Sequence, residues 1–332
     1  MSTPVLEVSD LHVTFATPDG AVQAVRGLDL VVEQGEVVGI VGESGSGKSV
    51  SMLAVMGLLP QSAEVSGSIR FQGDELVGLS DAGLRRYRGT KMTMIFQDPM
   101  TSLNPVYTVG YQVAEGIQVH KGLRRKDAMA RAVELLRTVG IPNPEERAHQ
   151  YPHQFSGGMR QRAMIAIAIA NDPELLIADE PTTALDVTIQ AQVLQTLALA
   201  RDVTNASIVL ITHDLGVVAG TADRVLVMYA GRPVEIAHVD ELFAHPRHPY
   251  TLGLLGALPR LDDSGRERLV PIEGAPPSLV HVPPGCPFHP RCPYAEDICR
   301  VDVPALRPME IITHWSACHF AERLEAKDVG AR

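Results

Sequence analysis

Residues 42–49 carry the pattern Gly-x4-Gly-Lys-Ser, which constrains the fold more than any other segment of the chain. The β-branched run at residues 37–41 predicts a buried strand before it, and residues 50–59 predict a helix that stops before Pro60. Glycines at such a strand-to-helix turn let backbone N–H groups converge on phosphates, and the helix N-terminus adds a favourable dipole. The segment therefore predicts a phosphate-binding loop; a glycine-rich turn before a helix is the alternative.

Two side chains of this loop have specific tasks in such a site. The Lys48 ammonium is a point charge for the β- and γ-phosphates, and the Ser49 hydroxyl can ligate Mg²⁺. The residues expected to bind the phosphates are Gly42, Glu43, Ser44, Gly45, Ser46, Gly47, Lys48, Ser49 and Val50.

A second acidic site follows the apolar run at residues 175–178. Asp179 and Glu180 emerge where that predicted strand ends, which is the edge at which open α/β sheets bind ligands. Asp179 is suited to hold Mg²⁺ through water, and Glu180 to orient or deprotonate an attacking water. Taken alone, the two acids could instead be a charge pair at a helix N-terminus.

The rest of the chain predicts a parallel sheet with helical segments. A helix at about 188–203 between two strands gives the β-α-β alternation of such a sheet. Residues 99–160 have a helical pattern, and the proline-rich residues 271–308 predict a loop-rich module that needs a cross-link. Further strands are expected at 5–15, 28–33, 67–72, 92–96, 175–178, 208–212, 223–228 and 232–236.

Composition excludes several classes of protein. The 332 residues are enough for two or three domains, and 45% hydrophobic content with 20% charged content is globular. A net charge of −10 argues against wrapping nucleic acid. The longest apolar run, residues 163–170, is too short to span a membrane, and the N-terminus lacks the pattern of a secretory signal. We therefore expect a cytoplasmic protein.

All four cysteines lie near the C-terminus, with the spacing C-x5-C-x6-C-x18-C. In a reducing compartment this grouping favours a metal site over disulfides. Four thiolates can hold Zn²⁺ or a [4Fe–4S] cluster, and unmetallated thiols are the third possibility. The spacing matches neither a zinc ribbon nor the compact ferredoxin run. The positions are Cys286, Cys292, Cys299 and Cys318.

At residues 155–162 the chain resembles the ATP-binding cassette (ABC) transporter ATPases. The segment Phe-Ser-Gly-Gly-Met-Arg-Gln-Arg is similar to their signature motif, which contacts the nucleotide held by the opposite subunit. The usual motif has Leu first and Gln fifth, where this chain has Phe155 and Met159. The core of the motif is retained as Ser156, Gly157 and Gly158.

Other positions resemble the same family over residues 5–240. Gln97 resembles the Q-loop glutamine, a Mg²⁺ ligand that links the site to the transmembrane partner, and residues 184–186 (Ala-Leu-Asp) resemble the D-loop that ends in Asp186. His213 resembles the switch histidine for the γ-phosphate, and Phe15 the aromatic that stacks on adenine. Taken alone, either side chain could have only a structural role.

The resemblance implies an α/β fold of the P-loop NTPase (RecA-like) type with an antiparallel β subdomain. The nucleotide-binding core is expected at residues 1–98 and 161–240, an α-helical subdomain at 99–160, and a small C-terminal Pro/Cys-rich module at 241–332. The resemblance also implies ATP hydrolysis in a dimer that closes on two ATP molecules. The expected catalytic residues are Lys48, Gln97, Glu180 and His213, and the Mg²⁺ ligands are Ser49, Gln97 and Asp179.

Two other interpretations compete with that of a transporter ATPase. A soluble ABC protein of translation or DNA repair usually has two cassettes or a long coiled coil, and this chain has one phosphate loop and no heptad run. A non-catalytic iron–sulfur or zinc regulator would not require both Glu180 and His213.

The C-terminal residues resemble ATPases that serve dipeptide and oligopeptide importers. The similar segments are HPYTLGLLGALP at 248–259, IEGAPP at 272–277, CPFHPRCP at 286–293 and ACH at 317–319. Members of this branch carry four tail cysteines that hold [4Fe–4S], so the resemblance favours a cluster. Related importers carry nickel, glutathione, haem or oligosaccharide, so peptide is the leading cargo and those are the alternatives.

The same resemblance implies the partners. They are a second ABC ATPase, either a paralogue or another copy, two transmembrane permease subunits and an extracytoplasmic substrate-binding protein, without nucleic acid. The expected place is peripheral, on the cytoplasmic face of the cell (inner) membrane.

Overall fold

The computed structural model describes residues 3–97, 102–183, 185–258 and 272–324. The chain divides into two compact units. The first unit comprises residues 1–6, 31–37 and 71–211, and the second comprises residues 7–30, 38–70 and 212–332.

The sheet of the first unit contains β6 (Met92–Ile95), β7 (Leu175–Asp179) and β8 (Ser207–Thr212, whose last residue belongs to the second unit). They lie in the order β8-β7-β6, and both pairings are parallel. Every residue of β7 is buried, as expected for a central parallel strand. Ile95 pairs with Ala178, so β6 and β7 end side by side.

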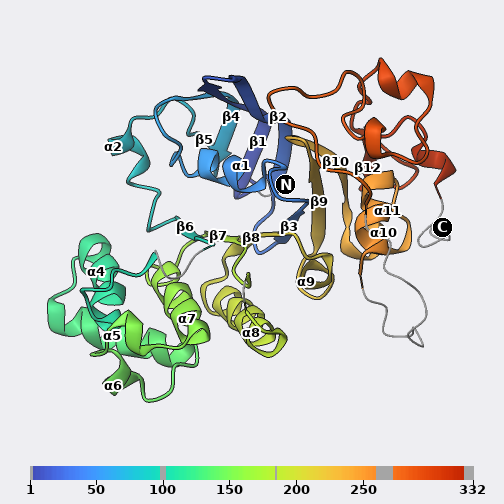
Figure 1. Cartoon of the computed structure of the whole chain (residues 1–332). Coiled ribbons are helices and arrows are strands. Elements are labelled where there is room, and N and C mark those ends of the chain that lie inside the picture. The colour runs from blue at the N-terminus through green and yellow to red at the C-terminus, as the bar shows by residue number, and fades with distance from the viewer. Residues whose placement is uncertain (1–2, 98–101, 184, 259–271, 325–332) are drawn as a thin grey trace, which may run out of the picture. The chain divides into compact units, whose positions relative to one another are not determined.

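Helices make up most of the remainder of this unit (Figure 1). Helix α4 packs on α5 and both pack on α7, while α5 also contacts α6. The ends of α4 follow from local chemistry, because the Thr108 side chain accepts a hydrogen bond from Tyr111 N and Gly122 adopts the left-handed conformation. The elements are β5 (Asp74–Glu75), α2 (Asp81–Leu84), α4 (Val109–Lys121), α5 (Arg125–Thr138), α6 (Pro144–Arg147), η1 (Pro152–Gln154), α7 (Gly157–Ala168) and α8 (Val187–Thr204).

The second unit contains two groups of strands, apart from one or two end residues of β1, β2, β3 and β4 that belong to the first unit. One is hydrogen-bonded in the order β2 (Gly20–Val32), β1 (Leu6–Thr17), β4 (Ala63–Phe71). The other has the order β11 (Arg307–Pro308), β12 (Trp315–Ser316), β10 (Arg232–His238), β9 (Arg224–Tyr229), β3 (Val37–Val41). Within this second group, β3 and β9 are parallel, and the pairs β9/β10, β10/β12 and β11/β12 are antiparallel.

Helix α1 (Lys48–Val55) is shorter than predicted. The helix ends four residues before residue 59 because Gly57 has φ +60° and closes a Schellman motif. In that motif Gly57 N donates to Ala54 O and Leu58 N to Leu53 O, both at 2.9 Å. The predicted stop at Pro60 was therefore wrong, and the glycine ends the helix.

The C-terminal part is rich in loops, as its prolines predict. Within the described residues from 272 onward, regular structure is limited to β11, β12 and the short 3₁₀ helices η2 (His289–Arg291), η3 (Asp297–Arg300) and η4 (Ala321–Arg323). The preceding helices are α9 (Leu215–Ala219), α10 (Val239–Ala244) and α11 (Pro249–Gly256). In the described part of the chain, no helix has both the length and the apolar character needed to cross a membrane.

Candidate nucleotide site

Two glycines of the phosphate-binding loop allow backbone approaches that a side chain would block. Gly42 has φ +153°, and a Cβ there would lie 2.2 Å from the carbonyl oxygen of Met228. Gly47 has φ +99°, and a Cβ would lie 2.4 Å from the carbonyl oxygen of Ala24. The loop thus requires glycine at both positions, for steric reasons as well as for its backbone angles.

The polar groups of this loop are arranged for an anion. Lys48 is 4% exposed, and its Nζ donates to the carbonyl oxygens of Gly42 at 2.7 Å and Glu43 at 2.9 Å. The buried hydroxyl of Ser46 makes no hydrogen bond. Helix α1 begins without a side-chain cap. These features fit a loop whose amides and ammonium group bind phosphate.

In the first unit, Gln97 and Glu180 lie together beyond the ends of β6 and β7. Gln97 Nε2 donates to Glu180 Oε2 at 3.0 Å, and Thr183 Oγ1 donates to the same oxygen at 2.8 Å. The parallel pairing of the two strands produces this contact between residues 83 positions apart. Two residues selected from separate motifs are thus brought into one site.

The backbone of Glu180 is unusual. Its φ is +45°, an angle that a non-glycine residue rarely adopts, and its N–H donates to Ile211 O at 2.9 Å. Asp179 ends β7 and is only 6% exposed. Strained backbone of this kind occurs most often at functional sites. Asp179 is thus buried at the end of the strand, and Glu180 follows it in a backbone conformation that is typical of functional sites.

The signature segment begins α7. Ser156 is the N-cap, and its hydroxyl accepts a hydrogen bond from Met159 N at 3.3 Å. A Cβ at Gly158 would lie 2.8 Å from Cγ2 of Ile189, whereas Gly157 has only Leu185 Cδ2 nearby, at 3.8 Å. Gly158 is therefore required for packing α7 on α8, and the exposed Gly157 is not.

The remaining candidates lie at exposed or half-buried positions. Asp186 caps α8, accepting from Ile189 N at 3.0 Å, while Ala184 lies outside the described residues. Phe15 in β1 is half-buried, and His213 is exposed directly after β8. The phosphate-binding loop and His213 belong to the second unit, and the Gln97–Glu180 pair belongs to the first.

The four cysteines line one pocket. All four are free thiols, and the pocket contains about 370 Å³ of empty space, its mouth included. Burial raises the pKa of Cys292 and that of Cys318 to about 12 each. Among the described residues, no group of three or more His, Cys, Asp or Glu is placed to hold a single metal ion. The four thiols therefore line one pocket, but the described residues do not form a binding site for a single metal ion.

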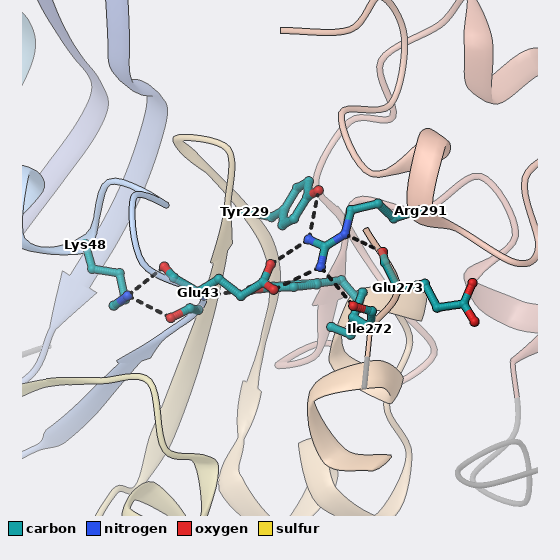
Figure 2. Close-up of polar contacts among 8 residues, drawn as sticks. Glu43, Lys48, Tyr229, Ile272, Glu273 and Arg291 are labelled. Carbon is teal, nitrogen blue, oxygen red and sulfur yellow. Dashed lines mark hydrogen bonds and ion pairs between the residues drawn. The ribbon is translucent and has the colours of Figure 1, made fainter. Parts of the chain in front are cut away.

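Two further residues contact the phosphate-binding loop and were absent from the predicted site. Tyr250 Oη accepts a hydrogen bond from Glu43 N at 2.7 Å, and Arg291 makes a two-pronged ion pair with the Glu43 carboxylate (Figure 2). Both belong to C-terminal segments that resemble peptide-importer ATPases. That similarity could have directed attention to them, but sequence spacing alone does not place them beside Glu43.

Family comparisons agree with this geometry. Residues 25–183 match the family described as "ABC transporter", and residues 234–299 match "Oligopeptide/dipeptide transporter, C-terminal region". The "Oligopeptide transport ATP-binding protein OppD" of Haemophilus influenzae is 53% identical over 90% of this chain and 92% of its own length. This chain belongs to the ABC transporter family. The second match assigns it to the branch with the oligopeptide/dipeptide C-terminal region.

Other relatives differ in length. The OppD protein of Mycobacterium tuberculosis is 59% identical over 95% of this chain, which spans only 52% of that relative. The "Dipeptide transport ATP-binding protein DppD" of Bacillus subtilis is 55% identical over 89% of this chain and 88% of its own length. Among solved structures, the dimeric ATP-binding cassette MJ0796 bound to ADP and Pi has a TM-score of 0.63 and 26% identity, and covers 70% of this chain and 98% of its own. The ABC fold is thereby confirmed.

Proposed function

We propose that this chain is the ATP-hydrolysing subunit of an ABC importer for di- or oligopeptides. The Gln97–Glu180 hydrogen bond carries the proposal, because it holds a candidate base at the ligand-binding edge of a parallel sheet. Relatives named for oligopeptide and dipeptide transport, at 53–59% identity, support the cargo class. Nickel, glutathione, haem and oligosaccharide remain alternative cargoes.

Each of the predicted residues would have its own part in the reaction. The backbone of the loop at 42–49 holds the phosphates, and the Lys48 ammonium exchanges the carbonyl oxygens of Gly42 and Glu43 for the β- and γ-phosphates. Ser49, Gln97 and Asp179 are the residues that would hold Mg²⁺, which neutralises phosphate charge when bound. Glu180 orients the attacking water and accepts its proton.

Residues at the surface complete the site in a dimer. Ser156, Gly157, Gly158 and Asp186 of one subunit would contact the nucleotide of the other. His213 would contact the γ-phosphate, and Phe15 would stack on adenine. The dimeric state described for MJ0796 supports this arrangement. ATP closes the dimer, and hydrolysis removes the contacts that keep it closed.

The importer assembly supplies the remaining partners. We infer a second ATPase of the same kind, either a paralogue or another copy, two permease subunits and an extracytoplasmic substrate-binding protein. The chain would then be held at the cytoplasmic face of the membrane by the permeases. The match to the oligopeptide/dipeptide C-terminal region supports this set of partners.

We further propose that Cys286, Cys292, Cys299 and Cys318 hold a [4Fe–4S] cluster. Four free thiols that line one pocket suit this group. In such a cluster each thiolate binds a different iron, so the four sulfur atoms need not surround a single metal ion. The cluster would cross-link the proline-rich tail. Iron and acid-labile sulfide in anaerobically purified protein would support it, and stoichiometric zinc without iron would overturn it.

Glu180→Gln tests the main proposal. We expect this variant to bind ATP with near-normal affinity and to lose turnover by about a hundredfold or more, because the amide cannot accept the proton of water. Thr183→Val removes only a hydrogen bond to Glu180 and serves as the matched comparison. Near-normal hydrolysis by Glu180→Gln would contradict the assignment of the base.

A further inference from the structure

Glu43, the second residue of the phosphate-binding loop, is held at two points by C-terminal residues. Arg291 Nη1 donates to Oε2 of Glu43 at 2.6 Å, and Nη2 donates to Oε1 at 2.9 Å (Figure 2). Tyr250 Oη accepts from the backbone N–H of Glu43 at 2.7 Å. The side chain and the backbone of one loop residue are thus both fixed from outside the loop.

Arg291 is itself rigidly held. Its side chain is 5% exposed, and Nε donates to Glu273 O at 3.0 Å, while Nη1 donates to Tyr229 Oη at 3.3 Å and Nη2 to Ile272 O at 3.4 Å (Figure 2). Its pKa is raised, chiefly by the hydrogen bonds to Glu43. A planar guanidinium fixed at this many points imposes one orientation on the carboxylate it pairs with.

On the loop side, the next contact is the lysine that would bind the phosphates. Lys48 Nζ donates to the carbonyl oxygens of Gly42 and Glu43 (Figure 2). A continuous series of polar contacts therefore runs from Arg291 through Glu43 to Lys48. A shift of the Glu43 backbone would therefore change the position of the Lys48 ammonium group.

On the tail side, Arg291 directly precedes Cys292, and Phe288 lies between Cys286 and Arg291. Phe288 lines the cysteine pocket and packs on the rings of Tyr229 at 5.2 Å and Tyr250 at 5.5 Å between centroids. The same short segment thus supplies Arg291 and supports the tyrosine that holds Glu43 N.

We infer that the cysteine-bearing tail positions the phosphate-binding loop for ATP, with Arg291 as the positioning residue. The ion pair orients Glu43 and neutralises a carboxylate that would otherwise repel the phosphates. By linkage, ATP bound at the loop stabilises the tail segment 286–292 to the same extent. This inference rests on the proposed function, since it requires that the loop bind ATP.

The first test measures the ATP dissociation constant of Arg291→Met, Glu43→Gln and the double variant in the full chain. We expect about a fivefold weaker affinity in Arg291→Met, partial recovery in Arg291→Lys, and no further loss in the double variant relative to Arg291→Met. Turnover at saturating ATP should change much less than KM. Arg323→Met is the control, because its exposed ion pair with Glu296 lies in the same tail and does not contact the loop.

The second test is hydrogen exchange at the amides of His289, Arg291 and Cys292, which donate within the tail segment. A non-hydrolysable ATP analogue should slow their exchange in the wild-type chain and in Arg323→Met, and should not do so in Arg291→Met. Equal ATP affinity and equal protection in Arg291→Met and wild type would overturn the inference. Failure of the wild-type chain to bind ATP would overturn the proposed function instead.

Discussion

Gln97 Nε2 donates a hydrogen bond of 3.0 Å to Oε2 of Glu180, joining the ends of two parallel strands. The amide keeps the carboxylate in one orientation, and Thr183 Oγ1 reinforces it from 2.8 Å. The glutamine that is predicted to link the site to a transmembrane partner is thereby in direct contact with the candidate base.

Gln97→Ala should release Glu180 from this orientation. We expect kcat for ATP hydrolysis to fall about tenfold, with little change in ATP affinity, because the loop that is proposed to bind the phosphates is unaltered. Steady-state kinetics measures both constants. Thr183→Val removes the other hydrogen bond and should give a smaller loss; a Gln97→Ala enzyme with unchanged kcat would contradict the positioning role.

Gly42→Ala and Gly47→Ala should each abolish measurable ATP binding. The added methyl group would meet a backbone carbonyl oxygen at 2.2 Å or 2.4 Å, so the loop must move to accept it. Gly220→Ala is the control, since a Cβ there has no heavy atom within 4 Å and its φ is −98°. Titration with a fluorescent ATP analogue reports the affinity, and retained binding by both loop variants would refute the assigned geometry.

The two signature glycines should respond differently to alanine. Gly157→Ala should fold normally and lose hydrolysis, because its neighbourhood is open and its proposed contact is with another subunit's nucleotide. Gly158→Ala should lower the free energy of unfolding by about 1–3 kcal/mol through overlap with Ile189, and Ile189→Ala should restore part of it. Denaturant melts and ATPase assays separate the two effects; full activity in Gly157→Ala would count against the signature role.

The buried hydrogen bond between Glu235 and His314 should stabilise the C-terminal part. The side chains are 0% and 2% exposed and lie 2.8 Å apart, joining β10 to the residue before β12. His314→Leu leaves the buried carboxyl group of Glu235 without this partner, so the free energy of unfolding should fall by about 1–3 kcal/mol. Thermal melts check this prediction by comparing His314→Leu with Arg323→Met, which removes only an exposed ion pair. Equal melting temperatures for the two variants would contradict the stabilising role of His314.

The sequence by itself predicted the phosphate-binding loop, the acidic strand end and the signature segment, because each is a local pattern. A strand, glycines at fixed positions and a helix start are contiguous in the chain, and local chemistry forms them. Most predicted strands lie within a few residues of those observed, since a buried parallel strand such as β7 is a continuous apolar run. The end of α1 was misplaced because a left-handed glycine can end a helix before a proline does.

Only the tertiary structure decided which distant residues meet. Parallel pairing of β6 with β7 brings Gln97 to Glu180, and the folded tail brings Arg291 to Glu43 across 248 residues of chain. Neither contact can be predicted from a periodicity or a residue spacing in the sequence, because both depend on strand register and on the path of loops. The sequence thus determined the local motifs from which phosphate chemistry is predicted, and the fold determined which distant side chains contact those motifs.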